Sequence, residues 1–276
     1  MKVDTQRRRL LGLGATGALA ALSGCSGATP FVGKRTKNTR KFDAASVDSL
    51  SVDGTTGKIR VRPTNADRVR IETVKQSGSV FTDLDDVNVE MGVENGELTV
   101  QTRETGDGSW LGGTPSVKMR IQLPSGVSLG RLRTENGTVD VRGVESDATL
   151  VTENGRVEAH DIDGFVAAES ENGSVTVHGV EGIDDVRTEN GSVEVEIPAI
   201  RDDTTVRSEN GSVTAKLARD LGATLVAKTD NGDVDFRLPD FEADLRTENA
   251  VQGTLGEGGP ELRFVTENGS IDVSEL

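Results

Sequence analysis

The chain has 276 residues, few aromatic side chains and a formal net charge of −15. Tyr is absent and Trp occurs once, so a thick globular core is hard to fill, whereas narrow β layers of Val, Leu, Ala and Thr need few aromatic residues. Because strong negative charge repels nucleic acid, the composition excludes nucleic-acid binding from the expected functions.

Residues 1–24 are predicted to be a signal peptide and not part of the fold. Arg7 and Arg8 open a twin-arginine export signal, the apolar run after them is too short to span a bilayer, and the Leu-Ser-Gly-Cys stretch that ends at Cys25 reads as a lipobox. In the bacterial and archaeal lipoproteins that this segment resembles, cleavage leaves the cysteine as the first residue, carrying lipid. We therefore expect an extracytoplasmic protein that lipidated Cys25 anchors to the outer face of the cell membrane.

Residues 25–45 are expected to form a flexible tether after the lipidated cysteine. Between residues 26 and 42 they carry five basic side chains and no acidic one. The basic charges could lie against anionic headgroups, each adding about 1 kcal/mol, or could keep a disordered spacer soluble. Both roles are compatible with the sequence.

Residues 46–276 repeat a short phrase, most often written Thr-Glu-Asn-Gly, at intervals of 18 to 21 residues. The residue four before each Asn is apolar, and the residue two before it is a small hydroxyl residue. The third and fifth residues after it are apolar, except after Asn249, where Gln252 predicts a distorted coil. The repeated Asn residues are Asn136, Asn154, Asn172, Asn190, Asn210, Asn231, Asn249 and Asn268.

Alternation of apolar and charged residues on both sides of the corner predicts a strand, a tight turn and a second strand in each repeat. We expect Asn-Gly to supply the positive φ angles of the turn. Thr56-Gly57 and Asn95-Gly96 are interpreted as weaker copies of the same corner.

Two arrangements fit these strands. Asn-Gly is a strong hairpin signal and could give a long antiparallel meander. In a β-solenoid, each repeat would instead be one coil, and equivalent residues would stack about 4.8 Å apart. Stacking rewards identical residues, because Asn and Thr ladders can hydrogen-bond from coil to coil. The strict Asn and hydroxyl columns therefore favour the solenoid.

The stretches SLSVDGTTGKIRVRP and VKMRIQLPSGVSL, together with the TENGSV phrases, resemble the putative adhesin domain family of unknown function. That family occurs in prokaryotic surface and membrane-associated proteins and is similar to autotransporter-adhesin head domains. The resemblance spans residues 46–276 and implies an all-β, single-domain, right-handed β-helix-like solenoid. Its motifs mark coils and turns, so it implies no catalytic residue.

An acidic residue stands one place before each repeated Asn, and stacking would line these carboxylates along one edge. Nearby Arg and Lys residues could pair with some of them. The functional alternative is weak association of Ca²⁺ or Mg²⁺, although carboxylates in single file make a poor cage of six to eight oxygens. This candidate cation edge comprises Glu135, Glu153, Glu171, Glu189 and Glu209.

Three further features are candidate sites. His160 and His178 occupy the same position in adjacent coils, but without a third ligand they predict no metal site. Trp110 and Leu111 lie in a Gly-rich loop that either contacts sugar or protein or caps the core. Five corners match the N-x-S/T glycosylation pattern, which the turn geometry alone could also select: Asn136, Asn172, Asn190, Asn210 and Asn268.

No set of nucleophile, base and orienting group can be assembled, and no cofactor is expected. The sequence therefore favours a non-enzymatic, lipid-anchored surface protein for adhesion, envelope scaffolding or binding of a surface glycan or envelope protein. One alternative is a polysaccharide-active β-helix enzyme, which would need convergent carboxylates in a groove built by long side loops. Another is an accessory sensor of envelope stress.

Overall fold

The computed structural model describes residues 33–79, 82–105 and 115–276, and almost all of its regular structure is β-strand. Within these ranges, no helix is long and apolar enough to cross a membrane. Some residues that the sequence singles out lie outside the described residues, namely Arg7, Arg8, Cys25, Trp110 and Leu111.

The first strands are β1 (Lys34–Asp43), β2 (Ser49–Thr56), β3 (Ile59–Thr64), β4 (Arg68–Ser77), β5 (Val87–Glu94), β6 (Glu97–Glu104), β7 (Ser116–Pro124), β8 (Ser128–Asn136), β9 (Val139–Arg142), β10 (Ala148–Asn154) and β11 (Val157–Asn172). They are followed by β12 (Val175–Asn190), β13 (Val193–Ile197), β14 (Thr204–Asn210), β15 (Val213–Leu217), β16 (Ala223–Asn231), β17 (Val234–Arg237), β18 (Phe241–Arg246), β19 (Ala250–Leu255), β20 (Glu261–Asn268) and β21 (Ile271–Glu275). Two short 3₁₀ turns, η1 (Ala44–Ser46) and η2 (Leu84–Asp86), each follow an Asp whose carboxylate accepts a backbone N–H of the turn.

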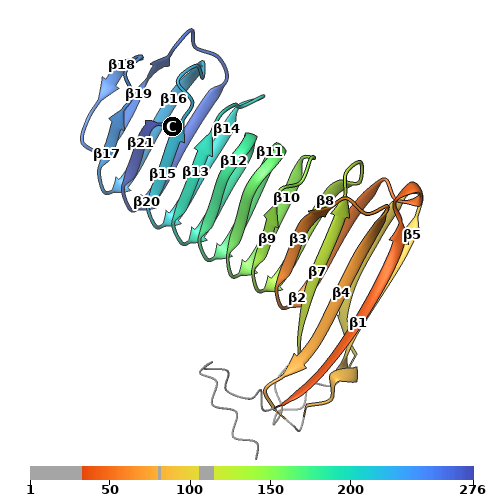
Figure 1. Ribbon diagram of the computed structural model, residues 1–276. Helices are drawn as coiled ribbons and strands as arrows, with labels where there is room; N and C mark the ends of the chain where they lie inside the picture. The colour runs from red at the N-terminus through yellow and green to blue at the C-terminus, as the bar shows by residue number, and fades with distance from the viewer. Residues whose placement is uncertain (1–32, 80–81, 106–114) are drawn as a thin grey trace, which may run out of the picture. The chain divides into compact units, whose positions relative to one another are not determined.

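The strands form two layers that are joined at the Asn-Gly corners (Figure 1). One layer has the order β1-β4-β7-β3-β9-β11-β12-β13-β15-β21-β17. The other has the order β5-β6-β2-β8-β10-β11-β12-β14-β20-β16-β19-β18. The long strands β11 and β12 contribute their first halves to the first layer and their second halves to the other.

Equivalent residues of successive repeats pair in parallel register, which confirms the solenoid and excludes the meander. Asn154 pairs with Asn136 and with Asn172, and Asn190 pairs with Asn172 and with Asn210. We use "coil" for one corner with the strand before it and the strand after it. The Thr56-Gly57 corner belongs to such a coil, since Thr56 pairs with Asn136.

The spatial order of the coils differs from their order in the chain. The last coil, β20 and β21, pairs with β14 and β15 on one side and with β16 and β17 on the other. Figure 1 shows these last strands lying between strands that precede them in the sequence. The C-terminal coil is therefore an internal layer of the stack.

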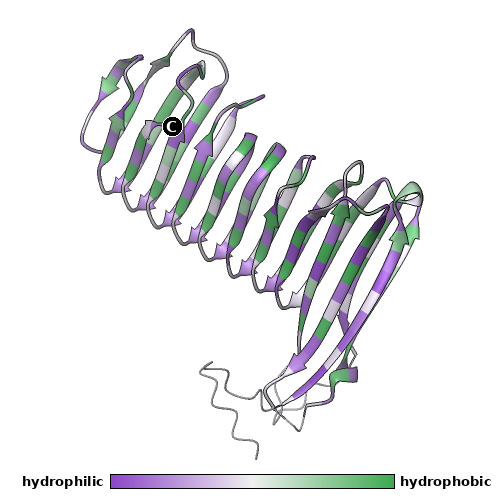
Figure 2. Ribbon diagram, viewed as in Figure 1, coloured by the Kyte–Doolittle hydropathy of each residue, from purple (hydrophilic) through white to green (hydrophobic). Residues whose placement is uncertain are grey.

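The core is a thin row of apolar side chains between the two layers. Along most strands, buried residues alternate with more exposed ones, and Figure 2 shows this as alternating bands of hydrophobic and hydrophilic colour. Strands β1 and β18 lack this alternation. Val139, Val157, Val175 and Val193 lie at the same position of successive coils and are at most 1% exposed. Phe264 is the largest fully buried side chain, and its ring meets that of Phe236 edge to face at 6.3 Å between centroids.

The repeat around Asn249 does not form a coil. Its two strands, β18 and β19, pair antiparallel with each other, and β19 also pairs antiparallel with β16. The prediction of a distorted coil is wrong here, because the inward alternation fails: Leu245 is 48% exposed and Gln252 is also exposed. The hairpin instead covers the hydrogen-bonding edge of β16.

Two predictions near the N-terminal side of the stack are also wrong. Asn95-Gly96 is a hairpin turn between antiparallel β5 and β6, with Asn95 in the left-handed region at φ 52°, and is not a coil corner. Residues 34–43, expected within a flexible tether, form strand β1, which pairs with β4 along its whole length. The sheet therefore begins at Lys34, before the predicted boundary at residue 46.

Asp140 is a buried carboxylate that ties β9 to β3. Its side chain is 2% exposed and lies within 3.2 Å of Arg60 and 2.7 Å of Arg62, with Lys58 and Arg142 also in contact. Burial alone would raise the pKa of Asp140, but the hydrogen bonds and charges of Lys58 and Arg62 hold it well below its ordinary value. The carboxylate therefore stabilises the fold above its ordinary pKa, and this contribution is lost as the pH falls toward the folded-state pKa.

Asp140→Asn is expected to lower the free energy of unfolding at neutral pH by roughly 1–3 kcal/mol, because it leaves several cations without their shared counter-charge. The difference from the native chain should shrink in acid. Urea unfolding of the variant and of the native chain, at neutral and at acidic pH, measures the loss of stability and its dependence on pH. Asp235→Asn is the matched control: it occupies the equivalent position in another coil but is 55% exposed, so we expect a change below about 0.5 kcal/mol. Equal effects of both substitutions at neutral pH would contradict this role of Asp140.

Candidate functional site

The Asn side chains of the corners form a continuous ladder. In each step the Nδ2 of one Asn donates to the Oδ1 of the Asn in the neighbouring coil, over 2.9–3.1 Å between the two atoms. All the amides point the same way along the stack, so each bond polarises the next. In spatial order, the ladder comprises Asn136, Asn154, Asn172, Asn190, Asn210, Asn268 and Asn231.

The corners need glycine for close approach of the stacked backbones. Among the described residues other than glycine, only Asn95 and Asp161 have positive φ, so the Asn residues of the coil corners do not adopt the left-handed region. The expected positive φ angles are confirmed for the glycines of four corners, Gly57, Gly155, Gly232 and Gly269, at 143–157°, but the expectation is wrong for the Asn residues. Instead, a Cβ on Gly173 would lie 1.6 Å from the carbonyl oxygen of Gly155 in the neighbouring coil.

The small hydroxyl residue two places before each Asn of the ladder is buried and bonds to the neighbouring coil. Thr152 donates to the carbonyl oxygen of Gly137 at 3.1 Å, and Thr188 donates to that of Gly173 at 2.8 Å. Ser170, Ser208, Thr229 and Thr266 make the equivalent bond. The hydroxyl column therefore links coils through backbone carbonyls and not through a Thr–Thr ladder, which explains why Ser and Thr alternate there freely.

The predicted acidic column lines the outer side of the same corners. Arg133 contacts Glu153 and lies 3.8 Å from Glu135, while Arg207 lies 3.2 Å from Glu209. Glu171 and Glu189, in the middle of the stack, have no ion pair with any described residue. Within the described ranges, no group of three or more His, Cys, Asp and Glu side chains is arranged to hold a metal ion. Weak association of Ca²⁺ or Mg²⁺ with this edge stays a prediction.

His160 and His178 meet, as their equivalent positions suggest. Their rings stack with centroids 5.7 Å apart and planes 17° from parallel. Burial, followed by the nearby charges of Arg142 and His178, lowers the pKa of His160. His178 lies between Glu194 and Glu196, with Nδ1 3.2 Å from Glu196. The pair therefore belongs to a column of charge contacts on the outer face of the sheet.

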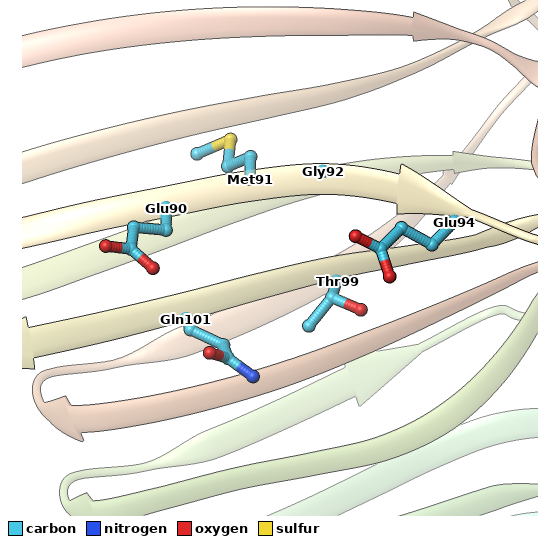
Figure 3. Close-up of a pocket in the computed structure, with 6 residues that line it drawn as sticks. All are labelled: Glu90, Met91, Gly92, Glu94, Thr99 and Gln101. Atoms are coloured by element: carbon cyan, nitrogen blue, oxygen red, sulfur yellow. The ribbon is translucent and has the colours of Figure 1, made fainter.

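A shallow groove of about 340 Å³ lies on the hairpin of β5 and β6. Figure 3 shows Glu90, Glu94 and Gln101 on one side of the strands and Met91 on the other. The groove is open above Gly92, where an added Cβ would meet nothing within 4 Å. The groove holds carboxylates, an amide and the Thr99 hydroxyl, and none of its described lining residues is a His or Cys that could activate a nucleophile. In the sequence, the only sign of this groove is Gly92, a glycine within strand β5.

The edge opposite the corners carries an arginine that the sequence analysis missed. Arg201 forms a two-pronged contact with Asp184 at 2.7 and 2.9 Å, reaches Asp147 at 2.9 Å and lies 4.5 Å above the ring of Phe165. These partners come from three different coils: Asp147 lies in the loop before β10, Phe165 lies in β11 and Asp184 lies in β12. Arg201 therefore ties neighbouring coils together in a structural role.

The five glycosylation candidates all belong to the Asn ladder. Asn172, Asn190, Asn210 and Asn268 each donate through Nδ2, the atom to which a glycan would be attached. Asn136 ends the ladder and acts there as an acceptor through Oδ1. Attachment of a glycan would compete with ladder bonds at the other positions, and occupancy remains a prediction.

The sequence model described as Toastrack DUF4097 matches residues 130–274. Solved structures similar to the chain include a putative cell adhesion protein from Clostridium sporogenes, with 11% identity, 88% of this chain and 100% of that chain covered and a TM-score of 0.40. A putative adhesin from Bacteroides fragilis is 10% identical, with 87% of this chain and 97% of that chain covered and a TM-score of 0.38. A putative lipid binding protein from Parabacteroides distasonis is 12% identical, with 87% of this chain and 95% of that chain covered and a TM-score of 0.38. No curated protein matches the chain. The family match begins in β8 and ends in β21, so it falls on the stacked coils.

Proposed function

Because the chain belongs to the Toastrack DUF4097 family, with the match on its stacked coils, we propose that it is a non-enzymatic surface protein. It is anchored by lipid at Cys25 and binds a partner along the Asn-Gly edge. The proposed role is adhesion or envelope scaffolding, and the partner class is a surface glycan or an envelope protein.

The observation that carries this proposal is the uniformity of the edge. The Asn ladder repeats one hydrogen-bond geometry from coil to coil, at 2.9–3.1 Å. Such an edge offers the same exposed amides and carboxylates at each step, about 4.8 Å apart. A repetitive or extended partner can use many weak, equivalent contacts on a surface of this kind, whereas an active site concentrates unlike groups at one point.

A binding screen tests the role of the edge. The full chain is tested against envelope polysaccharides and detergent-solubilised membrane proteins, with and without Ca²⁺. A triple variant at the edge, Glu153→Gln, Glu171→Gln and Glu189→Gln, should lose binding. A matched triple, Glu242→Gln, Asp244→Asn and Glu257→Gln, removes as many exposed charges elsewhere and should retain it. Equal binding by the two variants would contradict the role of the edge, and turnover of any glycan would overturn the non-enzymatic function.

Cys25→Ser is expected to move the protein from the membrane fraction to the soluble extracytoplasmic fraction, because the thiol is the proposed site of lipid attachment. Fractionation followed by immunoblotting measures the shift. Ser23→Ala preserves the small residue before Gly24 and should remain in the membrane fraction. Retention of the Cys25→Ser protein in the membrane would show that the lipid-anchor proposal is wrong.

A further inference from the structure

One face of this acidic protein is strongly basic. It is the outer side of strands β1, β4, β7, β3 and β9, which we call the basic face. Strand register brings its side chains together, because residues directly opposite each other project from the same side of a sheet. Arg120 of β7 is opposite Arg60 of β3 on one side and opposite Glu72 of β4 on the other. Arg70 of β4 is opposite Lys41 of β1.

The carboxylates within this face are covered by the cations that bind them. Glu72 is 15% exposed and contacts Lys37 at 2.7 Å and Arg120 at 3.0 Å. Asp140 is 2% exposed beneath four basic side chains. The cations that cover these two carboxylates remain 31–55% exposed. The surface that solvent meets is therefore more positive than the residue count suggests.

Several basic residues of the face have no carboxylate to neutralise them. Lys41, Arg70 and Lys118 are exposed and form no ion pair with any described residue. Lys118 is opposite Val74, which adds no charge of its own. Asp43 lies at the far end of β1, where its carboxylate caps η1. Three cations are thus held on rigid strands with unused hydrogen-bonding capacity.

The face also has a hollow suited to a phosphate group. It has a volume of about 330 Å³ and is lined by four arginines, Arg60, Arg62, Arg70 and Arg120, together with Glu72, Ile121 and Gln122. The Glu72 carboxylate is already bound by Lys37 and Arg120. Guanidinium groups bind phosphate oxygens in pairs of parallel hydrogen bonds, and their weak hydration makes them easier to desolvate than an ammonium group. The chemistry favours a monoester or diester phosphate above a neutral group.

The basic face lies near the proposed anchor along the chain. Lys34, the first residue of β1, is nine residues after Cys25. A fully extended segment of that length spans roughly 30 Å. If Cys25 carries lipid, β1 therefore lies within that distance of the bilayer surface. An anionic bilayer attracts the basic face and repels the acidic corners, so the charge asymmetry would orient the stack.

We propose that the basic face docks on anionic phospholipid headgroups, with a lipid phosphate in the arginine-lined hollow. It holds the N-terminal side of the stack against the bilayer. The orientation of the stack in the cell rests on the proposed lipid anchor, whereas headgroup binding by the face does not.

The test therefore uses the full chain with Cys25→Ser, so that no covalent lipid contributes. Co-sedimentation with vesicles of phosphatidylglycerol and phosphatidylcholine should exceed that with phosphatidylcholine alone, and the excess should fall as salt is raised. A second variant adds three substitutions to Cys25→Ser, namely Lys41→Gln, Arg70→Gln and Lys118→Gln. It should bind the anionic vesicles roughly 100-fold more weakly. These residues make no ion pairs with described residues, so the urea midpoint should be unchanged.

The control triple, Arg187→Gln, Arg219→Gln and Lys228→Gln, removes the same charge from distant coils and should leave vesicle binding within about threefold. Equal losses in the two triples would overturn the proposal. So would binding that requires no anionic lipid, or capture of alginate, a soluble anionic polysaccharide, without capture of vesicles. Each of these failures leaves the fractionation result for Cys25 unaffected, so the two proposals fail separately.

Discussion

Gly173→Ala is expected to lower the free energy of unfolding by roughly 3–5 kcal/mol. The added Cβ would lie 1.6 Å from the carbonyl oxygen of Gly155 and 2.5 Å from its carbonyl carbon. Both atoms belong to the backbone and cannot rotate away. The same corners are joined by the hydrogen bond from Gly155 N to Asn172 O at 3.0 Å, so relief of the clash requires the coils to separate. Urea unfolding followed by far-UV circular dichroism measures the loss.

Gly92→Ala is the matched control for this substitution. Gly92 also lies in the sheet, but a Cβ there would meet nothing within 4 Å, and its φ is not in the left-handed range. We expect a change within about 0.5 kcal/mol, since no contact is made or broken. If the two alanine variants unfolded at the same urea concentration, the corners would not require the close backbone approach that the structure describes.

The stacked architecture could be predicted from the sequence because several columns repeat identical residues. A hairpin array would accept any polar residue at the position of Asn154 or Asn172, whereas the ladder rewards Asn in each coil. The hydroxyl column was equally informative, although its bonds go to glycine carbonyls such as that of Gly155. Local pattern therefore predicted the repeat unit and its stacking.

The order of the coils could not be predicted in this way. A coil with an Asn-Gly corner presents nearly the same ladder to any neighbour, so nothing at the corner distinguishes Asn231 from Asn268 as the partner of Asn210. The corner dipeptide also cannot predict strand direction. Asn95-Gly96 has the same dipeptide as the coil corners, but it joins two strands that pair antiparallel. Strand direction depends on the neighbouring strand, which the repeat does not encode.

The basic face was missed for a different reason. Strand β1 has almost no buried residue, so its sequence lacks the alternation that identifies a strand, and its Lys and Arg residues resemble a solvated tether. It becomes a strand because β4 offers a full hydrogen-bonding edge from Arg68 to Ser77. The charge of the face then arises from register across several strands that are distant in the chain.

Phe264→Ala is expected to lower the free energy of unfolding by roughly 3–5 kcal/mol, because it empties the largest fully buried site of the core. Phe264 pairs in register with Val206 of β14 and with Ala227 of β16, so the cavity would open between coils that are not consecutive in the chain. The register partners Val206 and Ala227 are small and cannot fill the space. Phe264→Leu, which keeps most of the volume, should cost about 1 kcal/mol. Urea unfolding measures both values.

Hydrogen exchange on Phe264→Ala tests the spatial order of the coils directly. Because β20 lies between β14 and β16, loosening it should raise amide exchange in both strands, while β8 and β10 keep their native protection. A stack in chain order predicts something else: β14 and β16 would pair with each other and stay protected, and only the last coil would exchange faster. Faster exchange confined to residues 261–276 would therefore contradict the insertion of the C-terminal coil. Joint loss of protection in β14 and β16 would support the insertion, since β20 is the one partner that these two strands share among the described strands.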